Sequence, residues 1–526
     1  MAQAGVLERS DAVPSRPGPP AASQARSYRG LLVASLVLAA GITALGLRAH
    51  AMWFDELQAW NIARASHSLG DLYTNLRYEG HPILWYLPLF ALTRFTGNPH
   101  SMQVLQWCIA TTTFALVLFR APFSIPMRVA VIAGYCFAFE YGVISRSYGL
   151  SALLLIAALV FLGRPKPAWV WGGTMLVLLA WTSLPGAVLA IAVAATVAWM
   201  FRTHFVFVGT VLVAAAISAY TCIPPSDFSS FAPGLGGSAS KFGAGAPVHV
   251  ASAVAGAWRG LIPIPAGVGE WNSNLFDGFP GAVWLEALLA IGLFVLIFCA
   301  LRPYPFARAL WSVGSLGYVG FFVIVMLPEQ ARYAGFPFLL FLACAWLAFS
   351  PPARAPRPHD VAGSPREPLV AVLLVVLAAQ IVATVAIYPV ATSEPFSRDE
   401  SLAASVHAAH LENAIVSGQD WDGATVGGYL DRSVYSAVRG EWVRYFIHDE
   451  REARRFTTLR DRDVMCDAAR IATKRDTQVG VIVDHALRGA QLVAVSEEAR
   501  LYRVDAGADA TARWCSAPTT VIAPKT

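Results

Sequence analysis

Apolar runs close to the length of a membrane span recur through most of this 526-residue chain, from Gly30 to Tyr388. A helix needs about 20 apolar residues to cross a bilayer. Only 14% of the residues are charged, whereas about 25% is usual in soluble proteins. The sequence therefore predicts a polytopic α-helical membrane protein. By hydropathy we expect about eleven spans, at residues 30–48, 102–119, 129–144, 148–163, 168–183, 186–201, 204–222, 281–301, 306–327, 334–350 and 368–388.

The apolar run 82–96 is short for a span and is broken by Pro88, so the basic residues decide its placement. If this run crossed the membrane, the later basic loops would fall outside. If it lies along the outer interface, all of them fall on the cytoplasmic side, as the positive-inside rule requires. We therefore predict that Pro82–Phe95 does not cross and that Ser145–Ser147 lies on the same side as Asp55.

These choices set the expected domains. Residues 1–29, rich in Pro, Ala and Ser, are expected to be a disordered cytoplasmic tail. Residues 30–388 form the transmembrane domain, with outer loops 49–101 and 223–280. The Gly- and Ser-rich first part of the second loop is typical of a flexible segment. A net charge of +5, spread over short loops, leaves no footprint for nucleic acid.

Residues 389–526 differ in composition, because charges are dense and short apolar runs alternate with amphipathic helical patterns. This alternation favours a small extracytoplasmic α/β domain. Cys466 and Cys515 both fall in it, and whether they pair in an oxidising compartment stays open. Gly427-Gly428 lacks the spacing of a dinucleotide fingerprint. We expect strands within 413–418, 424–430, 479–487 and 491–496, and helices within 401–411 and 461–475.

Asp55 and Glu56 directly follow the first span and sit among bulky apolar side chains such as Trp53 and Trp60. One interpretation is a solvated helix end. The other is functional, because ionisable groups beside apolar neighbours at a membrane are costly to keep and tend to mark sites. The bulky apolar residues around Asp55 and Glu56 favour a functional site.

Four short motifs give the sequence a resemblance to the GT-C superfamily of membrane glycosyltransferases, which includes the protein O-mannosyltransferases and the lipid A aminoarabinose transferases. They are FDELQAW (54–60), EGHPILWY (79–86), SRSYGL (145–150) and PEQARYAGFPFL (328–339). The resemblance covers about residues 30–350. It implies a polyprenyl-phosphate-linked sugar donor used on the periplasmic side of a bacterial inner membrane, in a multi-pass protein with a cytoplasmic N-terminus and a periplasmic C-terminal domain.

By this resemblance Asp55 is the catalytic carboxylate and Glu56 is its catalytic companion. A carboxylate near the acceptor oxygen can take or orient its proton. Arginine matches a phosphate with paired donors, so we expect Arg146 and Arg332 to bind substrate, together with their neighbours Tyr148 and Tyr333. Interfacial anchoring is the alternative for these outward-facing Arg and Tyr residues.

Glu79 and His81 occupy a position where relatives carry polar residues before proline, and we expect them to bind substrate. In some relatives groups here hold a divalent metal ion, the single cofactor considered, but two ligands do not complete a site and a structural role for His81 is equally open. Trp271 and Asn272 are further substrate-binding candidates, with interfacial anchoring again the alternative. Weaker candidates for contacts to the sugar or the donor are Trp258, Arg259, Asn274, Lys241 and His249.

Together these features predict an inverting glycosyltransferase that moves a sugar from the lipid donor to a cell-envelope glycan, lipid or protein. One alternative is a transporter or flippase, but transporters bury charges at the midplane of the bilayer in paired broken helices, whereas the charges here gather at one face. The other is a membrane sensor with a periplasmic receptor domain, which leaves the one-sided polar cluster unexplained.

Overall fold

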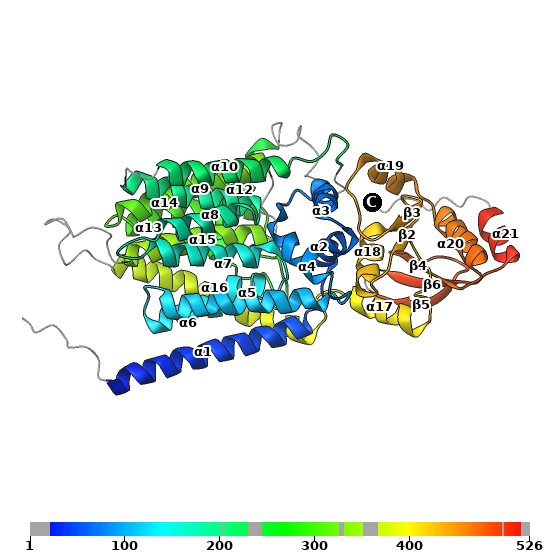
Figure 1. Ribbon diagram of the computed structural model, residues 1–526, viewed down its shortest axis with the longest axis horizontal. Helices are drawn as coiled ribbons and strands as arrows, with labels where there is room; N and C mark the ends of the chain where they lie inside the picture. Colours follow the sequence, from blue (N-terminus) through cyan, green and yellow to red (C-terminus); the bar gives the residue numbers. More distant parts are fainter. Residues whose placement is uncertain are drawn as a thin grey trace, which may run out of the picture.

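The computed structural model describes residues 22–201, 205–229, 245–325, 331–350, 367–496 and 499–516. A helical bundle and a C-terminal α/β domain lie end to end, and a group of short helices lies between them (Figure 1). These are α2 (Phe54–Ala65), α3 (Leu69–Asn75), η1 (Leu76–Tyr78), η2 (Ile83–Trp85) and α4 (Tyr86–Leu92). Most of the predicted N-terminal tail, together with the weaker candidate Lys241, lies outside the described residues.

Within the described residues, six bundle helices are long and apolar enough to cross a membrane. They are α1 (Ala22–Ala49), α5 (His100–Arg120), α13 (Ala282–Ala300), α14 (Pro305–Ile324), α15 (Ala331–Phe349) and α16 (Glu367–Ser393). Shorter apolar helices pack among them: α7 (Ser147–Leu162), α8 (Trp169–Ala180), α9 (Leu184–Phe201) and α10 (Phe205–Thr221). A polytopic membrane fold is thus supported, and the count of about eleven spans stays a prediction.

The predicted span 129–144 is wrong as a single helix. Helix α6 (Ile125–Ala133) ends at Gly134, and a π-helical turn, η3 (Cys136–Glu140), follows it. Gly142 allows the chain to fold back after this turn, because a Cβ there would lie 2.4 Å from the carbonyl oxygen of Phe137. π-Turns are often found at functional sites.

The predicted outer loop 223–280 is also wrong in part, because it contains a 16-residue helix, α12 (Ala246–Leu261), that packs against α13 and α15. Small residues make this close packing possible, as is common between membrane helices. A Cβ on Gly260 would lie 1.7 Å from the Ala334 carbonyl oxygen, so the two backbones touch. His249 on this helix bonds through Nε2 to the Val323 carbonyl oxygen at 2.9 Å. This bond links two helices of the protein, so His249 has a structural contact in place of the expected contact to the sugar donor.

Two placements made from the basic residues agree with the structure. The run 82–95 forms η2 and the 7-residue helix α4, far short of the roughly 20 residues that a span needs. The backbone N–H of Ser145 donates to Glu56 Oε1 at 2.6 Å, so Ser145–Ser147 lies on the same side as Asp55. Both observations are consistent with the predictions, and the placement of 82–95 relative to a membrane stays a prediction.

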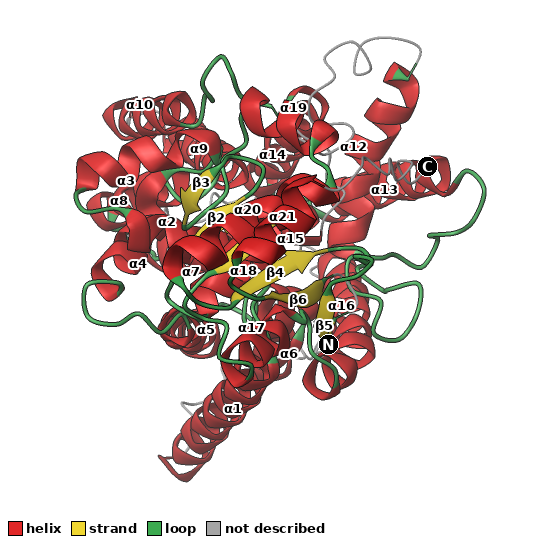
Figure 2. Ribbon diagram, turned by 90° about the vertical axis from the view of Figure 1, so that its right-hand side faces the viewer, coloured by secondary structure: helices red, strands yellow, loops and turns green. Residues whose placement is uncertain are grey.

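The C-terminal domain holds a 6-stranded sheet in the order β3-β2-β1-β4-β6-β5. Strand β1 runs parallel to β2 and β4, and the other pairs are antiparallel. Viewed from the domain end, the sheet lies across the end of the bundle (Figure 2). The strands are β1 (Ile415–Ser417), β2 (Val434–Ser436), β3 (Glu441–Val443), β4 (Val479–Val483), β5 (Gln491–Val495) and β6 (Arg500–Val504).

Helices cover both faces of this sheet, because alternate residues of its central strands enter two separate cores. Val416 and Val481 pack in the core beneath α20, whereas Ile415 and Ile482 pack in the core beside α17 and α18. The domain helices are α17 (Asp399–Ala408), α18 (Asp420–Tyr429), α19 (Glu450–Thr458), α20 (Asp461–Arg475) and α21 (Ala508–Ser516).

Most of the predicted elements of this domain are present, and one is wrong. Of residues 424–430, expected as a strand, 424–429 belong to helix α18, which packs against α2 of the membrane half, and Leu430 caps the helix. Gly428 permits this contact, since a Cβ there would lie 2.7 Å from Leu57 Cδ1. Cys466 and Cys515 form a disulfide that joins α20 to α21.

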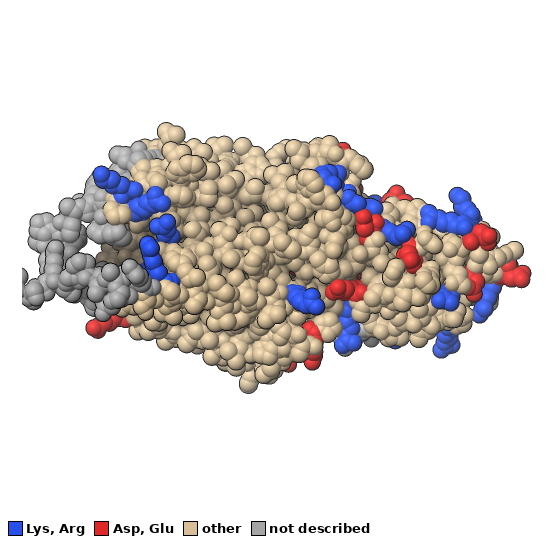
Figure 3. All heavy atoms as spheres, turned by 60° about the horizontal axis from the view of Figure 1, so that its bottom comes forward, with Lys and Arg blue, Asp and Glu red and all other residues tan. Residues whose placement is uncertain are grey.

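Charged side chains leave a broad band of the bundle bare. On the face shown in Figure 3, Lys and Arg gather at the end far from the C-terminal domain, and charges of both signs cover that domain. The band between them is the surface expected of helices that lie in lipid.

Candidate active site

A cavity of about 550 Å³ lies where the bundle meets the C-terminal domain. The facing ends of α7, α9, α10, α14 and α15 form its membrane-side wall, and α2, the segment after η1 and the C-terminal domain close it. The lining residues are Phe54, Asp55, Tyr78, Glu79, Gly80, His81, Arg146, Tyr148, Ser183, Leu184, Pro185, Cys222, Pro224, Phe228, Val325, Arg332, Tyr333, Trp421, Phe446 and His448.

Asp55, Arg146 and Arg332 converge in this cavity. Asp55 lies in the first turn of α2, and its Oδ2 is 2.5 Å from Arg332 Nη1 at the start of α15. Arg146, just before α7, donates from Nη1 to the Asp55 backbone carbonyl. The Arg332 guanidinium carbon also lies 5.2 Å from the ring centres of Trp53 and of Tyr333. One carboxylate is therefore held between two cations.

The charges around Asp55 keep it ionised. Burial by itself would raise the pKa of Asp55, but the positive charges of Arg332 and Arg146 outweigh burial and hold that pKa below its usual range. The side chain of Arg332 is only 7% exposed. In the described part of the chain, its Nε and Nη1 have no hydrogen-bond partner of good geometry. Buried guanidinium donors without partners are unusual and suit an oxyanion ligand.

His81 is held as a neutral imidazole. Its Nδ1 donates to the Glu79 backbone carbonyl at 2.6 Å, while Nε2 lies 3.4 Å from Tyr148 Oη and 3.4 Å from Arg146 Nη2. Burial, with the Arg146 charge, lowers the pKa of His81 to about 4. Burial also raises the pKa of Glu79 to about 7, against a hydrogen bond from Gln58 that lowers it. The cavity thus holds two carboxyl groups whose pKa values are shifted in opposite directions: that of Asp55 is lowered and that of Glu79 is raised.

The divalent metal ion considered for Glu79 and His81 has a poor fit in this arrangement. Nδ1 of His81 is used by a backbone carbonyl, and Nε2 faces the cationic Arg146. In the ranges that the structure describes, no group of three or more His, Cys, Asp or Glu side chains is placed to hold a metal ion. Glu79 and His81 alone do not make such a site, because two ligands are too few for a dedicated one.

Glu56 does not line the cavity but fastens three segments behind it. Its Oε2 bonds to His50 Nε2 at 2.7 Å and accepts from the Trp53 backbone N–H at 3.3 Å, and its Oε1 accepts from Ser145. These bonds join the end of α1, the start of α2 and the turn before α7. Glu56 therefore supports the segments that carry Asp55 and Arg146. This role differs from the expected one, a second catalytic carboxylate.

Trp271 and Asn272 also lie outside the cavity wall, although both were expected to bind substrate. Trp271 Nε1 donates to Glu140 Oε2 at 3.0 Å, and its ring packs edge-on against Trp53 with centres 5.5 Å apart. Asn272 Oδ1 accepts from the Ala331 backbone N–H at 2.6 Å, at the first residue of α15. Asn272 therefore braces the segment that carries Arg332, whereas Trp271 braces η3 and the ring of Trp53.

The weaker candidates near them are also engaged by the protein. Trp258 Nε1 donates to Asn274 Oδ1 at 3.2 Å. Arg259 is bonded to Glu286 and to Asp277.

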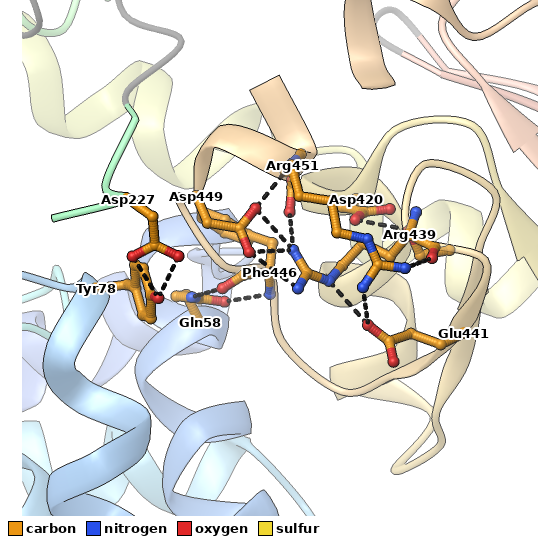
Figure 4. A network of polar contacts seen from close by, with 11 residues as sticks. Gln58, Tyr78, Asp227, Asp420, Arg439, Glu441, Phe446, Asp449 and Arg451 are labelled. Carbon is orange, nitrogen blue, oxygen red and sulfur yellow. Dashed lines mark hydrogen bonds and ion pairs between the residues drawn. The ribbon is translucent and has the colours of Figure 1, made fainter. Parts of the chain in front are cut away.

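The C-terminal domain supplies lining residues that the sequence did not single out: Trp421, Phe446 and His448. They lie hundreds of positions after the membrane-side motifs, so no local pattern links them to the cavity. Gln58 of the membrane half bonds directly to Phe446 of the C-terminal domain, and Tyr78 is linked to that domain through Asp227 (Figure 4). Tyr78 Oη donates to Asp227 Oδ1 at 2.9 Å, and the Asp227 carbonyl accepts from the Glu450 backbone N–H at 2.8 Å.

No family model and no curated protein sequence matches this chain. Among solved structures, it is similar to a crystal structure of ArnT from Cupriavidus metallidurans bound to undecaprenyl phosphate. The identity is 14%, the TM-score is 0.49, and the match covers 90% of this chain and 98% of that chain. At this identity and TM-score the match carries no weight in assigning the cavity, whose interpretation rests on its own side chains.

Proposed function

We propose that this protein is an inverting membrane glycosyltransferase. It moves a sugar from a polyprenyl-phosphate donor to a cell-envelope acceptor on the outer face of the inner membrane. The observation that carries this proposal is the positive charge of the cavity wall, where two buried arginines lie on the ionised Asp55: Arg332 at its carboxylate and Arg146 at its backbone carbonyl. An excess of guanidinium donors at the membrane-facing wall is suited to the phosphate of a lipid carrier.

In the proposed reaction, Arg332 and Arg146 hold the donor phosphate. The acceptor hydroxyl oxygen attacks the anomeric carbon from the face opposite to this phosphate. The bond between the anomeric carbon and the phosphate oxygen breaks, and polyprenyl phosphate leaves with the bonding electrons. The hydroxyl proton passes to a carboxylate of the cavity. Asp55, ionised and oriented by Arg332, is positioned to take or direct that proton.

The outer wall of the cavity suits an acceptor that presents a ring and hydroxyl groups. Trp421, Phe446 and His448 offer aromatic surfaces there, and aromatic faces combine a large apolar contact area with defined geometry. A glycan, glycolipid or glycoprotein of the cell envelope is therefore the proposed class of acceptor.

The charged ends of the helices support the proposed orientation. The first residues of α7 and the last residues of α14 line the cavity, so Arg164 after α7 and Arg308 at the start of α14 lie at the opposite end. His100 at the start of α5 pairs with Glu400 of the C-terminal domain at 3.4 Å, which puts Arg120 at that opposite end too. By the positive-inside rule this basic end is cytoplasmic, and the cavity and C-terminal domain are periplasmic.

A direct test uses the purified full-length chain in lipid vesicles with radiolabelled polyprenyl-phosphate hexoses and pentoses and an envelope extract as acceptor. We expect label to move from one donor to the extract, with release of unlabelled polyprenyl phosphate. A flippase would move the intact glycolipid across the vesicle membrane without cleavage, and a sensor would bind without turnover. Either of these results with every donor would contradict the proposal.

A further inference from the structure

We propose that Gln58 is a positioning residue through which the C-terminal domain holds the cavity carboxyl group of Glu79 for the transfer step. The outer domain is then part of the transfer machinery, and its docking sets the geometry of the cavity. This inference rests on the proposed function, because the affected step is sugar transfer.

Gln58 links the two halves of the molecule with a single amide. It lies one turn after Asp55 on α2, and it is 2% exposed. Its Nε2 donates to Glu79 Oε1 at 2.7 Å and to the Phe446 carbonyl oxygen at 2.8 Å, and its Oε1 accepts from the Phe446 backbone N–H at 3.2 Å (Figure 4).

The bonds to Phe446 dictate which way the amide faces. The backbone N–H of Phe446 needs an acceptor, which can only be Gln58 Oε1, and the Phe446 carbonyl needs a donor, which can only be Nε2. The second hydrogen of Nε2 is then directed at Glu79. Among the described residues, no other side chain donates a hydrogen bond to the Glu79 carboxyl group. Docking of the C-terminal domain therefore orients Gln58 Nε2, the hydrogen-bond donor that holds the Glu79 carboxyl group among the described residues.

Phe446 is itself anchored, because the segment 446–449 is tied down along its length. The Ser229 backbone N–H donates to the His448 carbonyl at 3.1 Å, and Arg439 Nη1 donates to Asp449 Oδ1 at 3.1 Å (Figure 4). The same segment places the rings of Phe446 and His448, with centres 4.8 Å apart, in the cavity wall. A substrate that contacts these rings presses on the segment that orients Gln58.

Asn61 offers a matched control, because it makes the same kind of link without reaching the cavity. It lies one turn further along α2, it is also 2% exposed, and its Nδ2 donates to the Ala424 carbonyl of the C-terminal domain at 2.7 Å. Asn61 does not line the cavity. Loss of either side chain removes one tie between the halves, but only the loss of Gln58 releases Glu79.

The experiment compares Gln58→Met, Gln58→Ala and Asn61→Ala in the full-length chain. Gln58→Met retains side-chain length and packing, so it separates loss of the amide from a packing defect. We expect kcat to fall about 10- to 10²-fold in both Gln58 variants, because small misplacements at a reacting centre cost up to that much. The Kd for the donor and the kcat of Asn61→Ala should stay near those of the wild type.

Hydrogen–deuterium exchange supplies a readout that does not depend on activity. Gln58→Met should raise exchange in residues 76–82, whereas Asn61→Ala should not. Equal kcat values for Gln58→Met and Asn61→Ala, or unchanged exchange at 76–82 in Gln58→Met, would overturn the inference. If the wild type transfers no sugar from any donor while Gln58→Met still loosens 76–82, the tether exists and it is the proposed function that fails.

Discussion

Two arginine clusters near the same end of the bundle show how one residue type serves two purposes. In the clamp formed by Arg259, Asp277 and Glu286, Nε of the arginine donates to Glu286 Oε2 at 2.9 Å and Nη2 donates to Asp277 Oδ1 at 2.6 Å. One cation there meets two carboxylates. In the cavity, Arg332 pairs with the carboxylate of Asp55, whereas Arg146 donates to the backbone carbonyl of the same residue.

The difference in charge balance separates a structural joint from a ligand site. The clamp ties the end of α12 to α13 and to the turn at Asp277, and the protein itself supplies the partners of its arginine. In the cavity, Arg332 Nη1 contacts the Asp55 carboxylate, but Nε of the same guanidinium has no hydrogen-bond partner among the described residues. Because buried charge is costly without a partner, the unmet donors of the cavity call for an anion from outside the protein.

The largest expected effect is that of Asp55→Asn. The amide keeps the size of the side chain but removes the charge that takes or directs the acceptor proton, so the initial transfer rate should fall about 10²–10⁴-fold. Affinity for the donor should hold or rise, since the positive excess grows. Transfer rate and donor Kd are measured on the same preparations, with Asp277→Asn as the matched control. A near-normal rate in Asp55→Asn would return Asp55 to the role of a solvated helix end.

A somewhat smaller loss is expected for Arg332→Lys. Lysine keeps the charge but loses the planar fork that matches a phosphate, and loss of one well-placed electrostatic donor costs about 10²-fold in kcat. Arg259→Lys, which changes the clamp in the same way, should leave kcat per folded molecule unchanged. If both variants lost activity equally, the contrast between the two clusters would not hold.

The reverse contrast should appear in stability. Arg259→Met leaves Asp277 and the buried Glu286 without their cation, and because the pair is partly exposed we expect a loss of about 2 kcal/mol, below the 3–5 kcal/mol of a fully buried pair. Arg332→Met should cost less, since Asp55 still has Arg146 beside it. Unfolding in detergent with increasing denaturant gives both values. A larger loss for Arg332→Met would show that the cavity cluster, too, is mainly a structural joint.

The smallest effect on stability is expected for His485, which forms a more exposed cluster of one cation and two carboxylates. His485, whose side chain is 36% exposed, bonds to Asp461 at 2.6 Å and to Asp484 at 2.5 Å. The hydrogen bond to Asp461 has the largest effect and the one to Asp484 the next, and together they raise the pKa of His485 from 6.5 to about 9. The imidazolium therefore stabilises the domain fully below pH 6.5, and this contribution is lost as the pH rises through about 9.

At such exposure the contribution of His485 should be at most about 1 kcal/mol. Melting curves of the wild type and His485→Gln from pH 6 to pH 10 give the measurement. The two melting temperatures should differ most at low pH and converge above the pKa. A constant difference across this range would mean that His485 acts by packing alone.

Much of this protein was predictable from local patterns. Long apolar runs specify a membrane protein whatever their partners, because hydrophobicity of a segment is a property of the segment itself. The short motifs were enough to name Asp55, Arg146 and Arg332 as candidates, and they meet in one cavity. The bond between Ser145 and Glu56 followed the expected sidedness.

Tertiary structure decided what each polar group faces. Glu56 follows Asp55 directly, yet the turn of α2 directs it away from the cavity to His50 and Ser145. Residues 424–430 have the composition of a strand, but 424–429 are helical, and Gly428 in this helix packs closely against α2. Packing between distant segments overrides local propensity in such places.

The link between Gln58 and Phe446 joins positions 388 residues apart. The sequence by itself therefore determined the membrane class and the set of charged groups. Which charges are met by the protein and which are left for a ligand was decided only by tertiary structure. The physical reason is that an ion pair or hydrogen bond forms where folded segments bring donor and acceptor within about 3 Å, and that proximity is a property of the whole fold.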